Sequence, residues 1–299
     1  MAKRGLEGMN LFTENVSDAE TAGRNLPKEY LSHSQIELYK KCPKAYEYKY
    51  VLGEDSTPVT AMIQGKSIHA ALEANYKQKI TSKKDIKVDE VLDTFSKDYD
   101  EHIVETEDKT AKEKGAIKDL SVAYLKEYQK EIAPRIQPAK VEEAIRVKLS
   151  STLEIIGFID LIQELKKPVD IPPEFSDKKE ELLASKNLKK AIVDHKVTSR
   201  KKAQTDADTS LQLSIYSMAT DIPVVRFDAL LPDKGNASPG HGYNQTVSFR
   251  TKEDIDFDKG VIISIAEAIS SGNFPKLGKG TWLCTKKFCP HYDKCHGKK

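Results

Sequence analysis

The amino-acid sequence predicts a mixed α/β fold, in which helices precede, interrupt and follow a central sheet. Three observations support this prediction. Residues 29–135 carry apolar residues at helical spacing, β-branched runs typical of strands begin after Pro138, and helical patterns return between and after those runs. Strands and helices that share one chain in this way pack as layers around a common core.

The helical part is expected in four segments. Ser34-Gln35-Ile36-Glu37 has the spacing of a capping box and predicts the start of a helix that runs to Cys42. Apolar periodicity predicts further helices over 63–79, 88–105 and 116–133, the last ending before Pro134. Residues 1–28 are polar and lack periodicity, so we expect a loosely docked N-terminal arm.

The sheet is expected to begin with strands rich in β-branched residues. These strands are predicted over 141–149, 153–162, 191–198, 224–231 and 243–250. Residues 166–190 are charged and proline-rich and predict an exposed insertion between the second and third strands. Helices are predicted over 207–220 and 252–271, the second leading into a cysteine-bearing tail.

Bulk composition limits the class of protein. The 299 residues are 38% hydrophobic and 31% charged, which suits one large globular domain. We expect this domain over 29–299, with a helical part at 29–135, a sheet core at 139–250 and a C-terminal part at 252–299. The sequence has neither a membrane-length apolar run nor a signal core, so we expect a cytoplasmic protein that does not bind membranes. A net charge of +2 does not by itself indicate a nucleic-acid binder.

Two aspartates stand inside apolar strands. Asp160 follows Ile155-Ile156-Gly157-Phe158-Ile159, and Asp194 follows Ala191-Ile192-Val193. A carboxylate in such a place loses hydration energy unless a cation compensates it. If the two strands pair, both aspartates can face one divalent ion.

Lys196 lies two residues beyond Asp194, so strand alternation puts both side chains on the same face. A lysine beside a metal ion can orient the attacking water and neutralise charge that grows on a phosphate. This arrangement is typical of a hydrolytic phosphodiester site. Each short motif, taken alone, can also be explained as an ordinary strand or helix residue. Only the ordered series of motifs favours the catalytic interpretation.

The ordered series Gly65-x3-His69-x3-Glu73, Gly157-x2-Asp160, Asp194-His195-Lys196 and Gln212-x3-Tyr216 resembles the RecB-like branch of the PD-(D/E)xK nucleases, over about residues 31–295. That branch includes the AddB and RecB nuclease domains and the CRISPR-associated adaptation exonucleases. The resemblance implies a restriction-endonuclease-like core and Mg²⁺ or Mn²⁺ as the catalytic ion. By this resemblance, the metal ligands are His69, Asp160, Asp194 and the backbone carbonyl of His195, and Lys196 is the catalytic lysine. Gln212 and Tyr216 belong to a helix that supports the site, and Glu73 is a partner of His69.

The four cysteines form a second constellation at the two ends of the chain. Cys42 stands alone near the start, while Cys284, Cys289 and Cys295 lie close together in the tail. Such clustering favours a metal ion or an iron–sulfur cluster over disulfides, and spacing leaves zinc and 4Fe–4S both open. The resemblance implies a 4Fe–4S cluster that holds the two chain ends together.

The substrate expected from these features is DNA, as single strands or duplex ends, cleaved from an end. Basic residues flank the catalytic strand and are candidates for contact with the DNA backbone: Lys189, Lys190, Arg200, Lys201 and Lys202. No phosphate-binding helicase motif is present, so we expect action beside a recombination or annealing protein, in recombination, repair or end processing. The alternatives are a non-catalytic DNA-binding scaffold and a CRISPR spacer-processing nuclease.

Overall fold

The computed structural model describes residues 22–297 except 186 and 279, and the chain divides into two compact units. One unit contains described residues up to 54, residues 147–156 and the chain from 259 onward, and the other contains 55–146 and 157–258. Most of the predicted N-terminal arm lies outside the described residues. Whether 29–299 is one domain stays a prediction.

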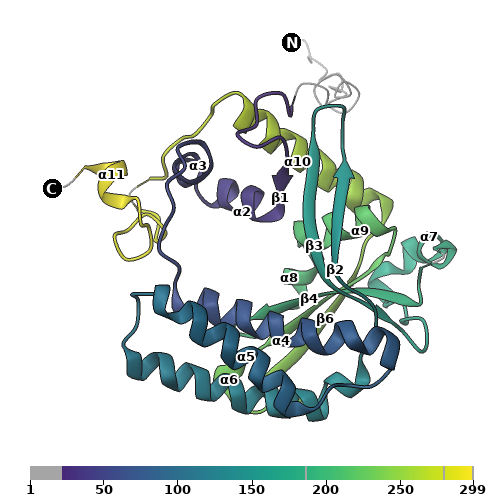
Figure 1. The fold of residues 1–299 in the computed structure, drawn as a ribbon. Helices are drawn as coiled ribbons and strands as arrows, with labels where there is room; N and C mark the ends of the chain where they lie inside the picture. The colour runs from purple at the N-terminus through teal and green to yellow at the C-terminus, as the bar shows by residue number, and fades with distance from the viewer. Residues whose placement is uncertain (1–21, 186, 279, 298–299) are drawn as a thin grey trace, which may run out of the picture. The chain divides into compact units, whose positions relative to one another are not determined.

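Three long helices open the second unit (Figure 1). They are α4 (Thr60–Ser82), α5 (Val88–His102) and α6 (Ala111–Glu131), and each confirms a predicted helix with shifted ends. Their buried faces share one core with Leu161 and Val193 of the sheet. Thr110 forms a capping box with Glu113, which explains why α6 begins earlier than its apolar pattern.

The sheet of this unit is mixed, as predicted. Its strands are β2 (Gln137–Lys148), β3 (Glu154–Glu164), β4 (Lys190–Val197), β5 (Val224–Leu230) and β6 (Tyr243–Phe249). The order runs β3-β4-β5-β6 with β2 beside β3; β4 and β5 pair in parallel, while β3-β4 and β5-β6 are antiparallel. The connection between the parallel strands carries helices, as a parallel pair requires.

The helix predicted over 207–220 is confirmed over its main part as α9 (Leu211–Thr220), while its first residues fall in a separate short helix, α8 (Gln204–Asp208), and in the break between the two. Ser210 separates them because its hydroxyl accepts a hydrogen bond from the amide of Leu213 and so caps α9. α9 therefore begins one residue before Gln212, which places Gln212 in its first turn.

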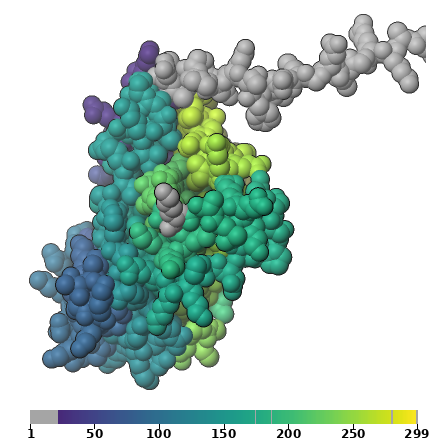
Figure 2. All heavy atoms as spheres, turned by 90° about the vertical axis from the view of Figure 1, so that its right-hand side faces the viewer, coloured from purple at the N-terminus to yellow at the C-terminus, as the bar shows by residue number. Residues whose placement is uncertain are grey.

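The predicted insertion 166–190 contains a 3₁₀ turn (Pro173–Lys178) and α7 (Lys179–Ala184), and its last residue, Lys190, pairs with Glu164 in the β3–β4 ladder. Most of its side chains are exposed, and Figure 2 shows the surface on the side where α7 lies. Part of the predicted exposed insertion is nevertheless buried. Leu182 and Leu188 are buried in a small core with Phe249, which anchors the insertion to the sheet.

The first unit contains β1 (Leu31–Ser32), α2 (His33–Lys41), α3 (Pro43–Tyr46), a π-helical turn (Glu47–Val51) and α11 (Tyr292–His296). α10 (Lys252–Ser270) contributes residues to both units. α2 is capped by Ser32, whose hydroxyl accepts from the amide of Gln35, so the predicted start at Ser34 was wrong. No helix in the described residues is long and apolar enough to cross a membrane.

Candidate active site and metal centre

His69, Glu142 and Asp160 form a group of metal-ligating side chains in the second unit. Their ligand atoms all lie within 4.8 Å of one another, and His69 Nδ1 lies 3.6 Å from Asp160 Oδ1. α4 supplies the imidazole, while β2 and β3 supply the carboxylates. Two oxygen ligands and one nitrogen ligand at this spacing can hold a divalent ion.

Asp160 and the Asp194 strand meet as the sequence predicts. The β3–β4 ladder ends at Leu161 opposite Val193. Just beyond, the backbone N–H of His195 donates a 2.7 Å hydrogen bond to Asp160 Oδ2. The carboxylate thus takes the place of a strand partner, so its position is fixed by the backbone of β4.

Asp194, Lys196, Gln212 and Tyr216 form a continuous chain of contacts. Lys196 Nζ lies 2.7 Å from Asp194 Oδ2 and donates to Gln212 Oε1 over 2.8 Å. The Gln212 side-chain amide in turn donates to the Tyr216 hydroxyl over 2.7 Å. The predicted lysine therefore lies between the buried aspartate and the predicted glutamine–tyrosine helix.

Burial and neighbouring charge shift the two aspartates in opposite directions. Burial raises the pKa of Asp194 to about 6, against the opposing effect of Lys196. Burial is the largest effect on Asp160 and raises its pKa, but the hydrogen bond and charge of His69, together with the charge and backbone N–H of His195, leave that pKa below its usual value. Asp160 is therefore ready to bind a cation at neutral pH, and Asp194 loses its proton readily when a cation approaches.

Glu142 was missed by the sequence interpretation. Nothing in Val141-Glu142-Glu143 distinguishes it from any charged strand residue. Its backbone φ of +49° lies in the left-handed region, which costs a non-glycine residue about 1 kcal/mol or more. Its carboxyl lies close to that of Asp160, and burial, followed by the charge of Asp160, raises its pKa to about 7.

The ring of His195 is buried against Tyr76, with ring centroids 6.1 Å apart in a stacked arrangement. Burial lowers its pKa to about 4, so the ring is neutral at physiological pH. The ring thus packs as a core residue, which is compatible with a role for the backbone of this residue alone. Glu73, predicted to partner His69, pairs with Lys77.

Of the predicted basic residues, Lys202 is held in a fixed position. Its backbone N–H donates to Asn244 Oδ1 over 3.2 Å, and its ammonium lies 5.5 Å from the centroid of the Phe227 ring. The ammonium of Lys196 lies 5.6 Å from the same ring. Arg200 and Lys201 are exposed nearby in sequence, and Lys190 lines a different feature of the unit.

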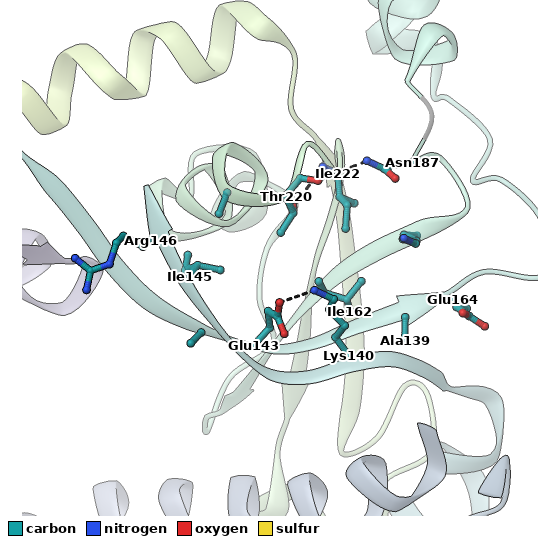
Figure 3. A pocket seen from close by; sticks show the side chains of 13 residues that line it. Ala139, Lys140, Glu143, Ile145, Arg146, Ile162, Glu164, Asn187, Thr220 and Ile222 are labelled. Atoms are coloured by element: carbon teal, nitrogen blue, oxygen red, sulfur yellow. Dashed lines mark hydrogen bonds and ion pairs between the residues drawn. The ribbon is translucent and has the colours of Figure 1, made fainter. Parts of the chain in front are cut away.

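That feature is a cavity of about 680 Å³ (Figure 3). Ile145, Ile162 and Ile222 give it apolar walls, and Lys140 and Glu143 pair at its margin. None of the predicted catalytic residues lines it. The cavity and the metal-ligating group are therefore separate features.

The four cysteines lie near one another in the first unit. Burial raises the pKa of the Cys289 thiol, and the charges of Cys42, Cys284 and Cys295 raise it further. Cys284 Sγ also lies 2.9 Å from His296 Nε2. Within the described chain, the cysteine sulfurs do not form a group whose atoms all fall within 4.8 Å.

Residues 30–171 match the family model of the PD-(D/E)XK nuclease superfamily. This range includes His69, Glu142 and Asp160 and ends before Asp194. Over this range, which is just under half of the chain, the sequence is similar to that superfamily. No curated protein is similar enough in sequence to count as a match.

Two solved structures are similar to the chain. A Eubacterium rectale protein that carries the provisional name of an exonuclease is 14% identical, with 93% of each chain covered and a TM-score of 0.43. The protein SSO0001 is 15% identical, with 88% of this chain and 96% of that one covered and a TM-score of 0.31.

Proposed function

We propose that the protein is a Mg²⁺- or Mn²⁺-dependent DNA exonuclease of the RecB-like PD-(D/E)XK type. The observation that carries the proposal is the contact of Lys196 with Asp194, on the strand whose backbone holds Asp160 beside His69. The superfamily match of residues 30–171 supports a nuclease.

The donor set fits a hard divalent ion. His69, Asp160 and Glu142, with Asp194 and the backbone carbonyl of His195, would supply oxygen ligands and one imidazole. When bound, such an ion lowers the pKa of water and neutralises charge on a phosphate.

The chain's own residues orient the reaction. Lys196, restrained by Gln212, is placed to hold the attacking water or the phosphate and to stabilise negative charge as it develops. Tyr216 fixes the amide orientation of Gln212 by accepting its N–H.

The expected substrate is single-stranded DNA or duplex ends, with a recombination or annealing protein as partner. The rival proposals are a DNA-binding scaffold without catalysis and a CRISPR spacer-processing nuclease. A scaffold has no need of an ordered series of acidic residues and lysine, whereas a nuclease requires it, so we favour the nuclease.

The test is incubation of the full chain with end-labelled linear single- and double-stranded DNA and with closed circles, in Mg²⁺, Mn²⁺ or EDTA. We expect metal-dependent loss of linear DNA with circles intact. Cleaved circles would make the protein an endonuclease, and no cleavage under any metal condition would favour the scaffold.

We further propose that Cys42, Cys284, Cys289 and Cys295 hold a 4Fe–4S cluster with a structural role. A cluster would relieve the mutual repulsion that raises the Cys289 pKa. Zinc is the alternative, because four thiolates suit either a zinc ion or a 4Fe–4S cluster.

A further inference from the structure

Beside Asp160, β3 carries an exposed aromatic ring. Phe158 is 59% exposed, while the adjacent Ile159 is fully buried. Phe158 stands two residues before Asp160, so strand alternation directs both side chains to the same face, with Cα atoms about 6.6 Å apart. The ring therefore lies beside a proposed metal ligand and is open to solvent.

α4 carries a second exposed apolar side chain, on the helix face that bears His69. Met62 is 62% exposed and precedes His69 by seven residues, which is about two helical turns and puts both on one helix face. A single exposed apolar side chain is ordinary. Here two of them share the face of their own element with a metal-ligating residue, Phe158 with Asp160 and Met62 with His69.

Cationic groups complete the surroundings. The ammonium groups of Lys196 and Lys202 lie over one ring, that of Phe227, and can contact phosphates. Exposed apolar groups next to cations match a polymer that alternates flat apolar bases with phosphates. Single-stranded DNA has this chemistry, because its base faces are open.

We propose that Phe158 is a stacking platform for a base of single-stranded DNA next to the scissile phosphate, with Met62 as a second apolar contact for the strand. The proposal rests on the proposed nuclease function and names its substrate class. In a duplex both faces of a base are covered by its neighbours, so Phe158 selects single strands or frayed ends.

The test measures DNA binding by the full chain in EDTA, so that no cleavage occurs. Fluorescence anisotropy with a labelled oligothymidylate should show about 10-fold weaker binding for Phe158→Ala, in the range found for lost base stacking. Phe158→Trp should bind at least as tightly as the wild type, whereas Phe158→Leu, which is apolar but not aromatic, should resemble Phe158→Ala.

An oligonucleotide with abasic sites completes a double-mutant cycle. If Phe158 stacks on a base, Phe158→Ala should cost nothing further on the abasic strand. Phe257 is the matched control, because it is 72% exposed on α10, and Phe257→Ala should leave binding unchanged. Circular dichroism should show all variants folded.

The failures of the two proposals are distinguishable. Equal loss on abasic and normal strands, or no loss on either, would overturn the stacking role and leave metal-dependent cleavage untouched. Absence of Mg²⁺- and Mn²⁺-dependent cleavage by the wild type would overturn the nuclease, whatever the binding cycle shows.

Discussion

The backbone N–H of His195 donates to Asp160 Oδ2 over 2.7 Å, although the two residues are 35 positions apart. The hydrogen bond forms where the β3–β4 ladder has ended, so a carboxylate replaces a backbone partner at the site itself. An acceptor at this position serves the strands as well as the proposed metal ion. Substitutions of Asp160 should therefore keep an oxygen.

Asp160→Asn and Asp194→Asn should each lower the cleavage rate by more than about 100-fold, because loss of an outer partner of a metal ligand already costs about 10–100-fold. DNA binding should stay close to wild type, since these carboxylates are not phosphate contacts. Single-turnover cleavage and anisotropy measure the two effects. Asp170→Asn, in the exposed insertion, is the control, and near-wild-type cleavage by either test variant would refute the site.

Lys196→Ala should retain metal binding but lose most of the rate, because it removes the cation beside Asp194. Gln212→Ala should lower kcat by about 10-fold, because the amide oxygen of Gln212 holds the ammonium group of Lys196. A 10-fold loss corresponds to an activation free energy that is higher by about 1.4 kcal/mol. KM should change little. A Gln212 variant with unchanged kcat would show that the hydrogen bond is only structural.

Metal affinity should rise with pH. Burial raises the pKa of Glu142 to about 7 and that of Asp194 to about 6, so an ion must displace protons from both below these values. Because these carboxyl pKa values are raised, the metal-free folded state binds more protons than the unfolded state from about pH 4 to 7. The two carboxyls therefore make the metal-free protein less stable to unfolding as the pH rises through this range.

The Mg²⁺-induced increase in Tm should therefore be larger at pH 8 than at pH 5.5, and calorimetry should detect proton release on binding. Glu142→Gln should weaken Mg²⁺ binding and reduce the pH dependence between pH 6 and 8. An unaltered Mg²⁺ affinity in this variant would remove Glu142 from the ligand set.

Replacing Arg200, Lys201 and Lys202 with alanine should weaken DNA binding and flatten its salt dependence, because fewer counterions are released. Each lost phosphate contact on a single strand lowers the slope of log affinity against log salt by about 0.7. Lys202→Ala alone should account for one such contact, since its backbone is held by Asn244. An unchanged slope would return all three to ordinary solvated surface.

Anaerobically purified protein should be brown and contain about four irons per chain. Serine at any of Cys42, Cys284, Cys289 or Cys295 should lower the iron content and the solubility, because the proposed cluster would close a very long loop. Iron analysis and absorbance near 400 nm check this outcome. Stoichiometric zinc in a colourless, active protein would support a zinc site instead.

The sequence determined the strands and helices that carry strong patterns. Apolar β-branched runs predicted β3, β4 and β5 within a few residues, and the order of motifs placed Asp160, Asp194 and Lys196 on adjacent strands. These predictions succeeded because side-chain alternation and helical periodicity are local properties of the chain.

Only the tertiary structure decided the features that depend on contacts distant in sequence. Glu142 joins His69 through a left-handed backbone position that a glutamate in a strand does not indicate. Ser32 caps α2 and Ser210 caps α9, but the nearby sequence contains other, equally plausible signals for a helix start. The exposure of Phe158 and the replacement of a strand partner by Asp160 arise where β3 leaves its ladder, and that point is set by packing, which no short stretch of sequence encodes.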